Sequence, residues 1–192
     1  MATTIAPPFI AQNPATELLT AERYFRECQL DRSELINGKV IELMPPGGLH
    51  GKLMLRIGGL LSAFVLPHKL GELYGESGFI LSRDPDTVRG PDVAFLEASR
   101  VPPPHEEVFL LEGAPTLAIE ILSPNDRKRE VEAKVRLYFE KGTREVWIVD
   151  PSTKTVSIRN PNSTAIAYGI DDAIPGGDIL PGFSLPVRSI FE

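Results

Sequence analysis

Two acidic residues lie inside runs of apolar residues in the middle of the chain. Asp92 opens the run Asp-Val-Ala-Phe-Leu, and Glu120 stands within Leu-Ala-Ile-Glu-Ile-Leu. A buried, unpaired charge is strongly unfavourable, so each carboxylate needs a counter-charge, a metal ion or a shifted pKa. Lys134 follows in a segment with helical spacing. Two acids that hold a divalent cation, together with a lysine, form an arrangement that can cleave a phosphodiester bond.

The run 117–122 is apolar on both faces, which is typical of a strand at the centre of a covered sheet. Side chains alternate along a strand, so Glu120 shares a face with Ala118 and Leu122. The alternative is an edge strand whose Glu120 side meets water. Asp92 is ambiguous by itself, because a Pro-Asp pair can also begin a strand as a turn-capping element. Together the two carboxylates could hold Mg²⁺, while water and a substrate phosphate complete the octahedron.

The position of Lys134 follows from the helix predicted for residues 127–141. Its apolar stripe is formed by Val131, Val135 and Tyr138. At 100° per residue, Lys134 lies about 60° to the side of this stripe. Its ammonium can therefore either reach the cleft between Asp92 and Glu120 or pair on the surface with Glu130. Helical spacing alone leaves both possibilities open.

Periodicity and turn residues predict the elements around these groups. Asn37-Gly38 between two apolar runs predicts an N-terminal β-hairpin, because both turn residues need positive φ. One helix is expected from Ala15 or Thr16 to Cys28 and another from His50 to Leu66. Short strands are expected at 73–74, 79–81, 92–96, 116–122, 145–149, 155–158 and 165–168. The predicted fold class is α/β, with a central mixed β-sheet flanked by helices.

Composition narrows the possible classes of protein. With 192 residues, 42% hydrophobic and 24% charged, the chain is predicted to form a flexible tail over residues 1–15 and one domain over residues 16–192. No apolar run is long enough to span a membrane, and the first residues lack the features of a secretory signal. The single cysteine, Cys28, suits a reducing cytoplasm. The net charge of −6 argues against a module that coats DNA by charge alone.

An ordered set of motifs resembles the Uma-two family of restriction endonuclease-like proteins, within the PD-(D/E)xK nuclease superfamily. The resemblance covers most of residues 30–190. It is carried by Glu34-Leu-Ile-Asn-Gly38, Met44-Pro-Pro46, His50, Pro91-Asp92-Val-Ala-Phe, Glu120-Ile-Leu-Ser-Pro124, Lys134, Tyr138, Gly142, Val146-Trp-Ile-Val-Asp-Pro151 and Leu180-Pro-Gly-Phe183.

The resemblance implies a restriction-endonuclease-like core and a metal-dependent endonuclease, a hydrolase that cleaves DNA. Asp92 then matches the first metal-binding acid and Glu120 the second, with the backbone carbonyl of Ile121 as a further ligand. The implied cofactor is Mg²⁺, which Mn²⁺ can replace. The lysine expected two residues after the second acid is replaced by Leu122, and Lys134 matches a lysine that the following helix supplies instead.

Two further residues, His50 and Glu34, are weaker catalytic candidates expected to line the same cleft. A histidine at the start of a helix can equally be a cap or a solvated residue. A homodimer would allow one active site to act on each DNA strand. The alternative function is a catalytically degenerate nuclease fold that binds nucleic acid or another protein, which Leu122 and the acidic net charge favour.

Overall fold

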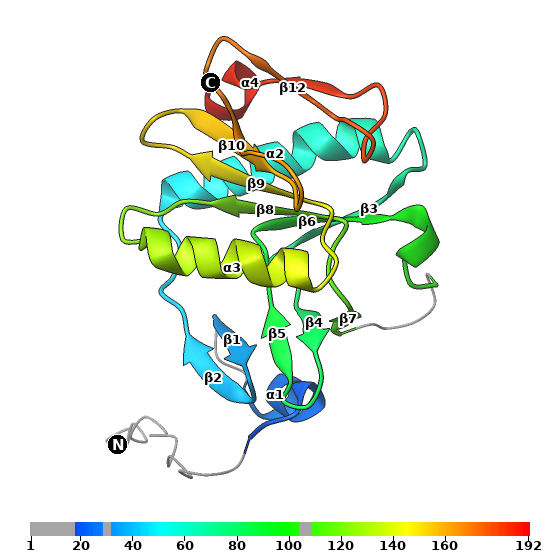
Figure 1. Ribbon diagram of the computed structural model, residues 1–192, viewed down its shortest axis with the longest axis vertical. Coiled ribbons are helices and arrows are strands. Elements are labelled where there is room, and N and C mark those ends of the chain that lie inside the picture. The colour runs from blue at the N-terminus through cyan, green and yellow to red at the C-terminus, as the bar shows by residue number, and fades with distance from the viewer. Residues whose placement is uncertain (1–17, 29–31, 104–108) are drawn as a thin grey trace, which may run out of the picture.

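The computed structural model describes residues 18–28, 32–103 and 109–192 (Figure 1). The tail expected over residues 1–15 lies outside the described residues. The predicted fold class is confirmed: the chain is mixed α/β, with mixed sheets flanked by helices. No helix in the described ranges is long and apolar enough to cross a membrane.

A six-stranded mixed sheet forms the centre of the fold, in the order β11-β10-β9-β8-β6-β3. β8 and β9 are parallel, and the other neighbouring pairs are antiparallel. Its strands are β3 (Gly71–Gly75), β6 (Val93–Glu97), β8 (Leu117–Ile121), β9 (Glu145–Asp150), β10 (Thr155–Arg159) and β11 (Ile166–Tyr168). Every residue of β8 is buried, and β8 lies between β6 and β9, so the edge-strand interpretation of Glu120 is wrong.

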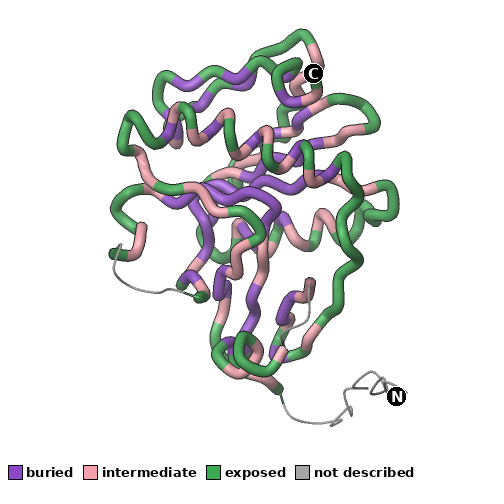
Figure 2. Tube along the Cα trace, turned by 180° about the vertical axis from the view of Figure 1, so that it is seen from behind, coloured by how far each residue is buried: buried purple, intermediate pink, exposed green. Residues whose placement is uncertain are grey.

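Two helices cover the opposite faces of this sheet (Figure 1). α2 (Gly48–Val65) packs on the odd-numbered side chains of β8, and α3 (Lys128–Glu140) packs on the side that carries Ala118. The predicted stripe of α3 is correct, because Val135 and Tyr138 are buried and Val131 is partly buried. The strand alternation predicted from the sequence therefore assigns each side chain of β8 to the correct face. Figure 2 shows the resulting buried band through the middle of the molecule.

A second, five-stranded sheet carries the N-terminal hairpin, in the order β2-β1-β5-β4-β7. Its strands are β1 (Ser33–Ile36), β2 (Lys39–Glu42), β4 (Phe79–Ser82), β5 (Thr87–Arg89) and β7 (Leu111–Glu112). The chain passes from one sheet to the other five times: between β2 and β3, β3 and β4, β5 and β6, β6 and β7, and β7 and β8. The residues after β5 and those before β6 are therefore at the junction of the two sheets.

The remaining elements lie at the two ends of the described chain. The helix expected from Ala15 or Thr16 is α1 (Ala21–Glu27), because Thr20 is extended and its hydroxyl accepts a hydrogen bond from the Arg23 N–H, which caps the helix there. The residues at which this helix was expected to start, 15 and 16, lie outside the described ranges. The C-terminal part contains β12 (Ala173–Pro175), β13 (Ser184–Pro186) and α4 (Arg188–Phe191), and the 3₁₀ turn η1 is Ala98–Arg100.

The hairpin turn gives a direct test of the fold. Asn37 and Gly38 have φ of 49° and 73°, as a type I′ turn requires. A Cβ at Gly38 would lie 2.6 Å from the Leu18 Cβ. We expect Gly38→Val to lower the free energy of unfolding by about 1–3 kcal/mol, as strained backbone positions do. Denaturant unfolding measures this, with Gly58→Val as the control, because a Cβ there meets no atom within 4 Å. Equal midpoints for Gly38→Val and wild type would contradict the prediction.

Candidate active site

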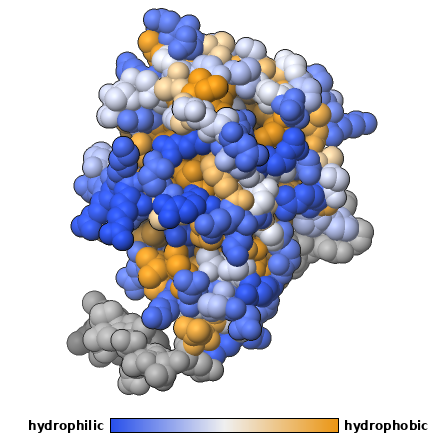
Figure 3. All heavy atoms as spheres, viewed as in Figure 1, coloured by the Kyte–Doolittle hydropathy of each residue, from blue (hydrophilic) through white to orange (hydrophobic). Residues whose placement is uncertain are grey.

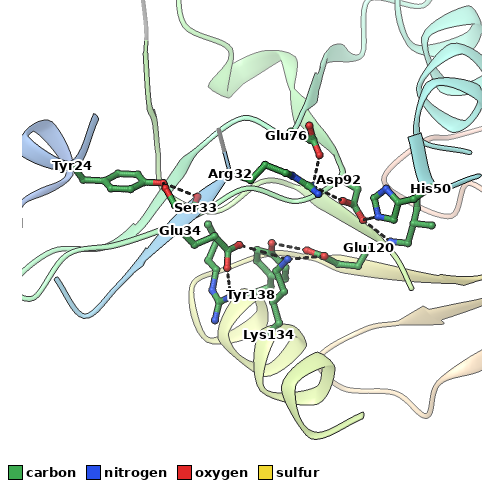
Figure 4. A network of polar contacts seen from close by, with 12 residues as sticks. Tyr24, Arg32, Ser33, Glu34, His50, Glu76, Asp92, Glu120, Lys134 and Tyr138 are labelled. Atoms are coloured by element: carbon green, nitrogen blue, oxygen red, sulfur yellow. Dashed lines mark hydrogen bonds and ion pairs between the residues drawn. The ribbon is translucent and has the colours of Figure 1, made fainter. Parts of the chain in front are cut away.

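Asp92 stands directly before β6 and is held from three sides (Figure 4). Its Oδ2 accepts a hydrogen bond of 2.7 Å from the Ile121 backbone N–H and lies 3.2 Å from the Nε2 of His50. Its Oδ1 lies 3.8 Å from a guanidinium nitrogen of Arg32, which also pairs with Glu76. Asp92 is only 6% exposed, and these contacts give its buried carboxylate oxygens polar partners. The sequence left Asp92 ambiguous, and the structure places it inside a charged cluster.

His50 is buried at the beginning of α2 and faces Asp92 instead of solvent. Its hydrogen bond to Asp92 raises the pKa of the imidazole, and burial opposes this rise. The interpretation of His50 as a solvated residue is therefore wrong. A protonated imidazole donates from Nε2 to the carboxylate, and this fixes the orientation of Asp92.

Glu120 points from β8 towards α3 and receives two side-chain hydrogen bonds (Figure 4). The Lys134 Nζ donates to Oε2 at 2.7 Å, and the Tyr138 hydroxyl donates to Oε1 at 2.8 Å. Burial raises the pKa of Glu120 to about 7; the Lys134 charge works against this rise, and the Asp92 charge adds to it. Glu120 is thus poised to exchange a proton near neutral pH.

The two acids are brought together by the register of their strands. β6 and β8 are antiparallel, with Val93 opposite Ile119, so one further step places Asp92 beside Glu120. The bond from the Ile121 N–H to Asp92 ties the carboxylate to the strand of Glu120. Two close carboxylates repel each other, which agrees with the contribution of Asp92 to the raised pKa of Glu120.

Lys134 reaches this site from α3. Its Nζ lies 2.7 Å from Glu120 Oε2 and 3.6 Å from Glu34 Oε1. Burial disfavours its charged form, but the carboxylates of Glu120 and Glu34 outweigh burial and raise the pKa of Lys134. The proposed surface pair with Glu130 is wrong, because the Glu130 carboxylate lies 3.8 Å from Arg127 and Lys134 pairs with Glu120 instead.

Comparisons with known proteins identify the family of the chain and a solved structure of similar fold. A model of the Uma2 family, described as "Putative restriction endonuclease", matches residues 21–188. The chain belongs to this family. A solved structure described as a "putative nuclease belonging to DUF820" from Anabaena variabilis is similar over 83% of this chain and 89% of that one, with a TM-score of 0.74 and 25% identity. No curated protein matches the chain.

Glu34 connects the Uma2 site to the second sheet. It lies on β1 and is only 3% exposed, and its Oε2 pairs with Arg89 at the end of β5. Its Oε1 accepts no hydrogen bond from the described residues and has Lys134 as a neighbour. Glu34 therefore belongs to the same charged cluster and places a second negative charge beside the lysine, and its role in catalysis stays a prediction.

Three residues of the site were not singled out from the sequence. Arg32 precedes β1 and joins Glu76 to Asp92, while Arg89 neutralises Glu34. Tyr138 belongs to the apolar stripe of α3 and is fully buried, but its hydroxyl binds Glu120. A buried tyrosine hydroxyl usually has a partner, so a tyrosine on the stripe that faces Glu120 was the available signal.

The donor set is compatible with a lightly coordinated cation. No group of three or more His, Cys, Asp or Glu side chains within the described ranges could hold a metal ion. Mg²⁺ does not need such a cage, because one or two carboxylates suffice when waters and phosphates supply the other ligands. Asp92 and Glu120 provide two hard oxygen donors whose repulsion a cation would relieve. Ile121 contacts Asp92 through its N–H, and its carbonyl as a ligand stays a prediction.

Proposed function

We propose that this Uma2 protein is a metal-dependent endonuclease that hydrolyses phosphodiester bonds of DNA. The observation that carries the proposal is the convergence of two buried carboxylates from neighbouring strands with a lysine of α3, whose Nζ lies 2.7 Å from Glu120. The family match and the nuclease-like neighbour support the same class of reaction. The proposal includes a cytoplasmic location and a homodimer in which each site acts on one strand.

In this proposal Asp92 and Glu120 hold Mg²⁺, or Mn²⁺ in its place, aided by the Ile121 carbonyl. When bound, the cation would lower the pKa of a water and would provide positive charge against the negative charge of the phosphate. The protein holds the two ligands in place. The Ile121 N–H and the His50 imidazole fix Asp92, and the Tyr138 hydroxyl fixes Glu120. Partners of this kind typically affect metal affinity or activity by about 10- to 100-fold.

Lys134 acts on the reacting groups in this scheme. An ammonium has three donors, and one of them binds Glu120 Oε2. The other two are available to orient the attacking water and to bind a phosphate oxygen in the transition state. Glu34 supports this role because its carboxylate favours the charged form of Lys134. His50 and Glu34 thus serve the proposed reaction through Asp92 and Lys134.

The raised pKa of Glu120 predicts how cation binding depends on pH. Below about pH 7 a proton occupies the carboxyl group and competes with the cation. We expect Mg²⁺ or Mn²⁺ affinity to rise between about pH 5.5 and about pH 8, with proton release on binding near neutral pH. Isothermal titration calorimetry in buffers of different ionisation enthalpy measures both. The Glu120→Gln variant is the control, because it cannot release that proton. An affinity that does not change over this range would contradict the assignment of Glu120 as a ligand.

A cleavage assay tests the proposed function. Plasmid, single-stranded and branched DNA are incubated with Mg²⁺ or Mn²⁺, and a parallel sample contains a chelator. We expect cleavage that needs the cation and is lost with the chelator. A protein that binds DNA with the cation and leaves every substrate intact would instead support the degenerate-nuclease alternative, which Leu122 and the net charge of −6 favour. Light scattering tests the proposed dimer separately.

A further inference from the structure

The connection from β2 to α2, together with the first two residues of α2, is an exposed stretch without charge. All residues from 43 to 49, Leu-Met-Pro-Pro-Gly-Gly-Leu, are exposed, and we call them the apolar loop. Met44 is 82% exposed and Leu49 58% exposed. A Cβ at Gly47 or Gly48 would meet no atom within 4 Å, so the space beside these two glycines is open. Contiguous exposed apolar surface of this kind commonly marks an interaction site.

Each end of the apolar loop is connected to a side chain that contacts Asp92. At its beginning, Arg32 donates a hydrogen bond of 3.3 Å to the Met44 carbonyl, and another nitrogen of the same guanidinium lies 3.8 Å from Asp92. At its end, Leu49 is followed directly by His50, which binds Asp92. The loop therefore forms one rim of the proposed active site. A DNA strand bound at Asp92 would place its neighbouring bases against it.

The helix that carries Lys134 offers a complementary charged surface. Arg127, Lys128 and Arg129 are consecutive and exposed at the N-terminal end of α3, only a few residues after Glu120. In a chain of net charge −6, such a basic group beside the site suits phosphate binding. Figure 3 shows hydrophilic residues over α3 and an apolar area below them, where the β2–α2 connection runs in Figure 1. Basic side chains that suit the phosphate backbone of DNA and apolar side chains that suit its bases thus lie on one face of the protein.

We propose that the apolar loop is a wedge that inserts Met44 and Leu49 against the bases next to the scissile phosphate and unstacks them. This inference rests on the proposed function. Apolar side chains such as Met, Leu and Pro are the groups that proteins insert between base steps to kink a duplex. The substrate class that follows is duplex DNA at a position that is easily unstacked. A second copy of this chain is a poorer occupant, because a protein seated on this rim would obstruct access to Asp92.

The test uses the double variant Met44→Gln/Leu49→Gln, which keeps side-chain size and removes apolar character. Both side chains are exposed, so the fold does not depend on them. The control is Leu55→Gln, which changes a leucine further along α2 that is 74% exposed. Binding is measured in Ca²⁺ with duplexes that contain 2-aminopurine, whose fluorescence rises when the base is unstacked. One duplex is fully paired, and the other carries an unpaired nucleotide. Cleavage of both duplexes is then measured in Mg²⁺.

We expect wild type and Leu55→Gln to raise the fluorescence of the paired duplex, and the double variant not to do so. The double variant should bind and cleave the paired duplex about tenfold or more less well, in line with the loss of base contacts. On the duplex with an unpaired nucleotide it should approach the wild-type rate, because that substrate is already unstacked.

The wedge proposal would be overturned if the double variant behaved like wild type, or if it were equally impaired on both duplexes. In either case, cleavage by the wild type would still support the proposed function. A change of oligomeric state in light scattering would assign the loop to a second copy. A wild type that neither binds nor cleaves DNA would end both proposals.

Discussion

Replacement of Asp92 or Glu120 by alanine is expected to reduce metal-dependent cleavage by more than about 100-fold, since changes to outer-shell partners of a metal site already cost up to that much. Each acid supplies one of the two carboxylates on which the proposed cation site depends. Each variant removes one negative charge and keeps the positive charge beside it, which is Arg32 at Asp92 and Lys134 at Glu120. The site is then less negative and attracts a cation less strongly. Calorimetry should therefore show no cation binding in either variant.

The two acids should differ in their effect on stability. In folded protein the pKa of Glu120 is about 7, above its ordinary value of 4.5, so the folded state binds the proton more tightly than the unfolded state. Wild-type stability then falls as pH rises between these values, and it stays lower above pH 7. Glu120→Gln does not titrate, so without metal its free energy of unfolding should lack the decrease that wild type shows between about pH 4.5 and about pH 7.

Asp92 is more deeply integrated into the fold. Its carboxylate accepts the buried Ile121 N–H and faces both His50 and Arg32. Asp92→Ala leaves these groups without their partner, and an unsatisfied buried donor costs about 1–3 kcal/mol. Asp92→Asn keeps the shape and one acceptor oxygen, so it should remain folded while losing cleavage. Thermal and denaturant unfolding distinguish the two variants.

An exposed carboxylate on the same helix as Lys134 provides the matched control. Glu130→Gln should leave both cleavage and cation binding unchanged, because Glu130 lies on the exposed side of α3. If Asp92→Asn and Glu120→Gln both cleave at the wild-type rate, the two acids are structural. The proposed nuclease mechanism would then have no metal site in the described part of the chain.

The sequence was most informative where local geometry decides the outcome. The alternation along β8 assigned Glu120 to the face of Ala118, and the structure places that face against α3. The turn residues Asn37 and Gly38 have the positive φ that their types favour. The 100° step of the helix placed Lys134 beside the stripe that contacts the sheet, and its Nζ lies within hydrogen-bond distance of Glu120. These placements depend on few neighbouring residues, so periodicity and turn residues could predict them, but helical spacing left open whether Lys134 reaches Glu120 or pairs with Glu130.

The contacts that were not predicted join residues far apart in the sequence. Glu34 and Arg89 pair across β1 and β5 of the second sheet, and nothing local links them. Arg32 precedes β1 of one sheet and Asp92 precedes β6 of the other, and the periodicity of single strands cannot reveal that these two positions meet. Tyr138 follows apolar spacing, so its pattern predicts the core and not the hydroxyl bond to Glu120. Side-chain contacts between distant strands depend on the topology of the sheets, which local sequence patterns do not determine.

Lys134→Met is expected to lower the turnover number by about 10²–10³-fold, the range for the loss of one transition-state donor. Leu122 occupies the position two residues after Glu120 and cannot donate a hydrogen bond, so the lysine must come from elsewhere. The Nζ of Lys134 contacts Glu120 and approaches Glu34. Methionine has a similar length without the charge, and it leaves the two acids in place.

The matched controls are Lys128→Met at the start of α3 and Lys141→Met just after its end, two exposed lysines on either side of Lys134. Both variants should have the wild-type turnover number if the loss of activity in Lys134→Met is specific to the position of Lys134. Lys134→Arg should also be impaired, because a planar guanidinium cannot occupy a position shaped for an ammonium.

Loss of the ammonium removes the charge that lowers the pKa of Glu120, so the pKa of Glu120 should rise in Lys134→Met. This variant should therefore bind the cation only at more alkaline pH than wild type. Calorimetry across that range separates this effect from a lost metal site, and single-turnover cleavage at alkaline pH isolates the chemical step. A full-rate Lys134→Met enzyme would show that α3 supplies no catalytic lysine, while Asp92 and Glu120 would remain the proposed metal ligands.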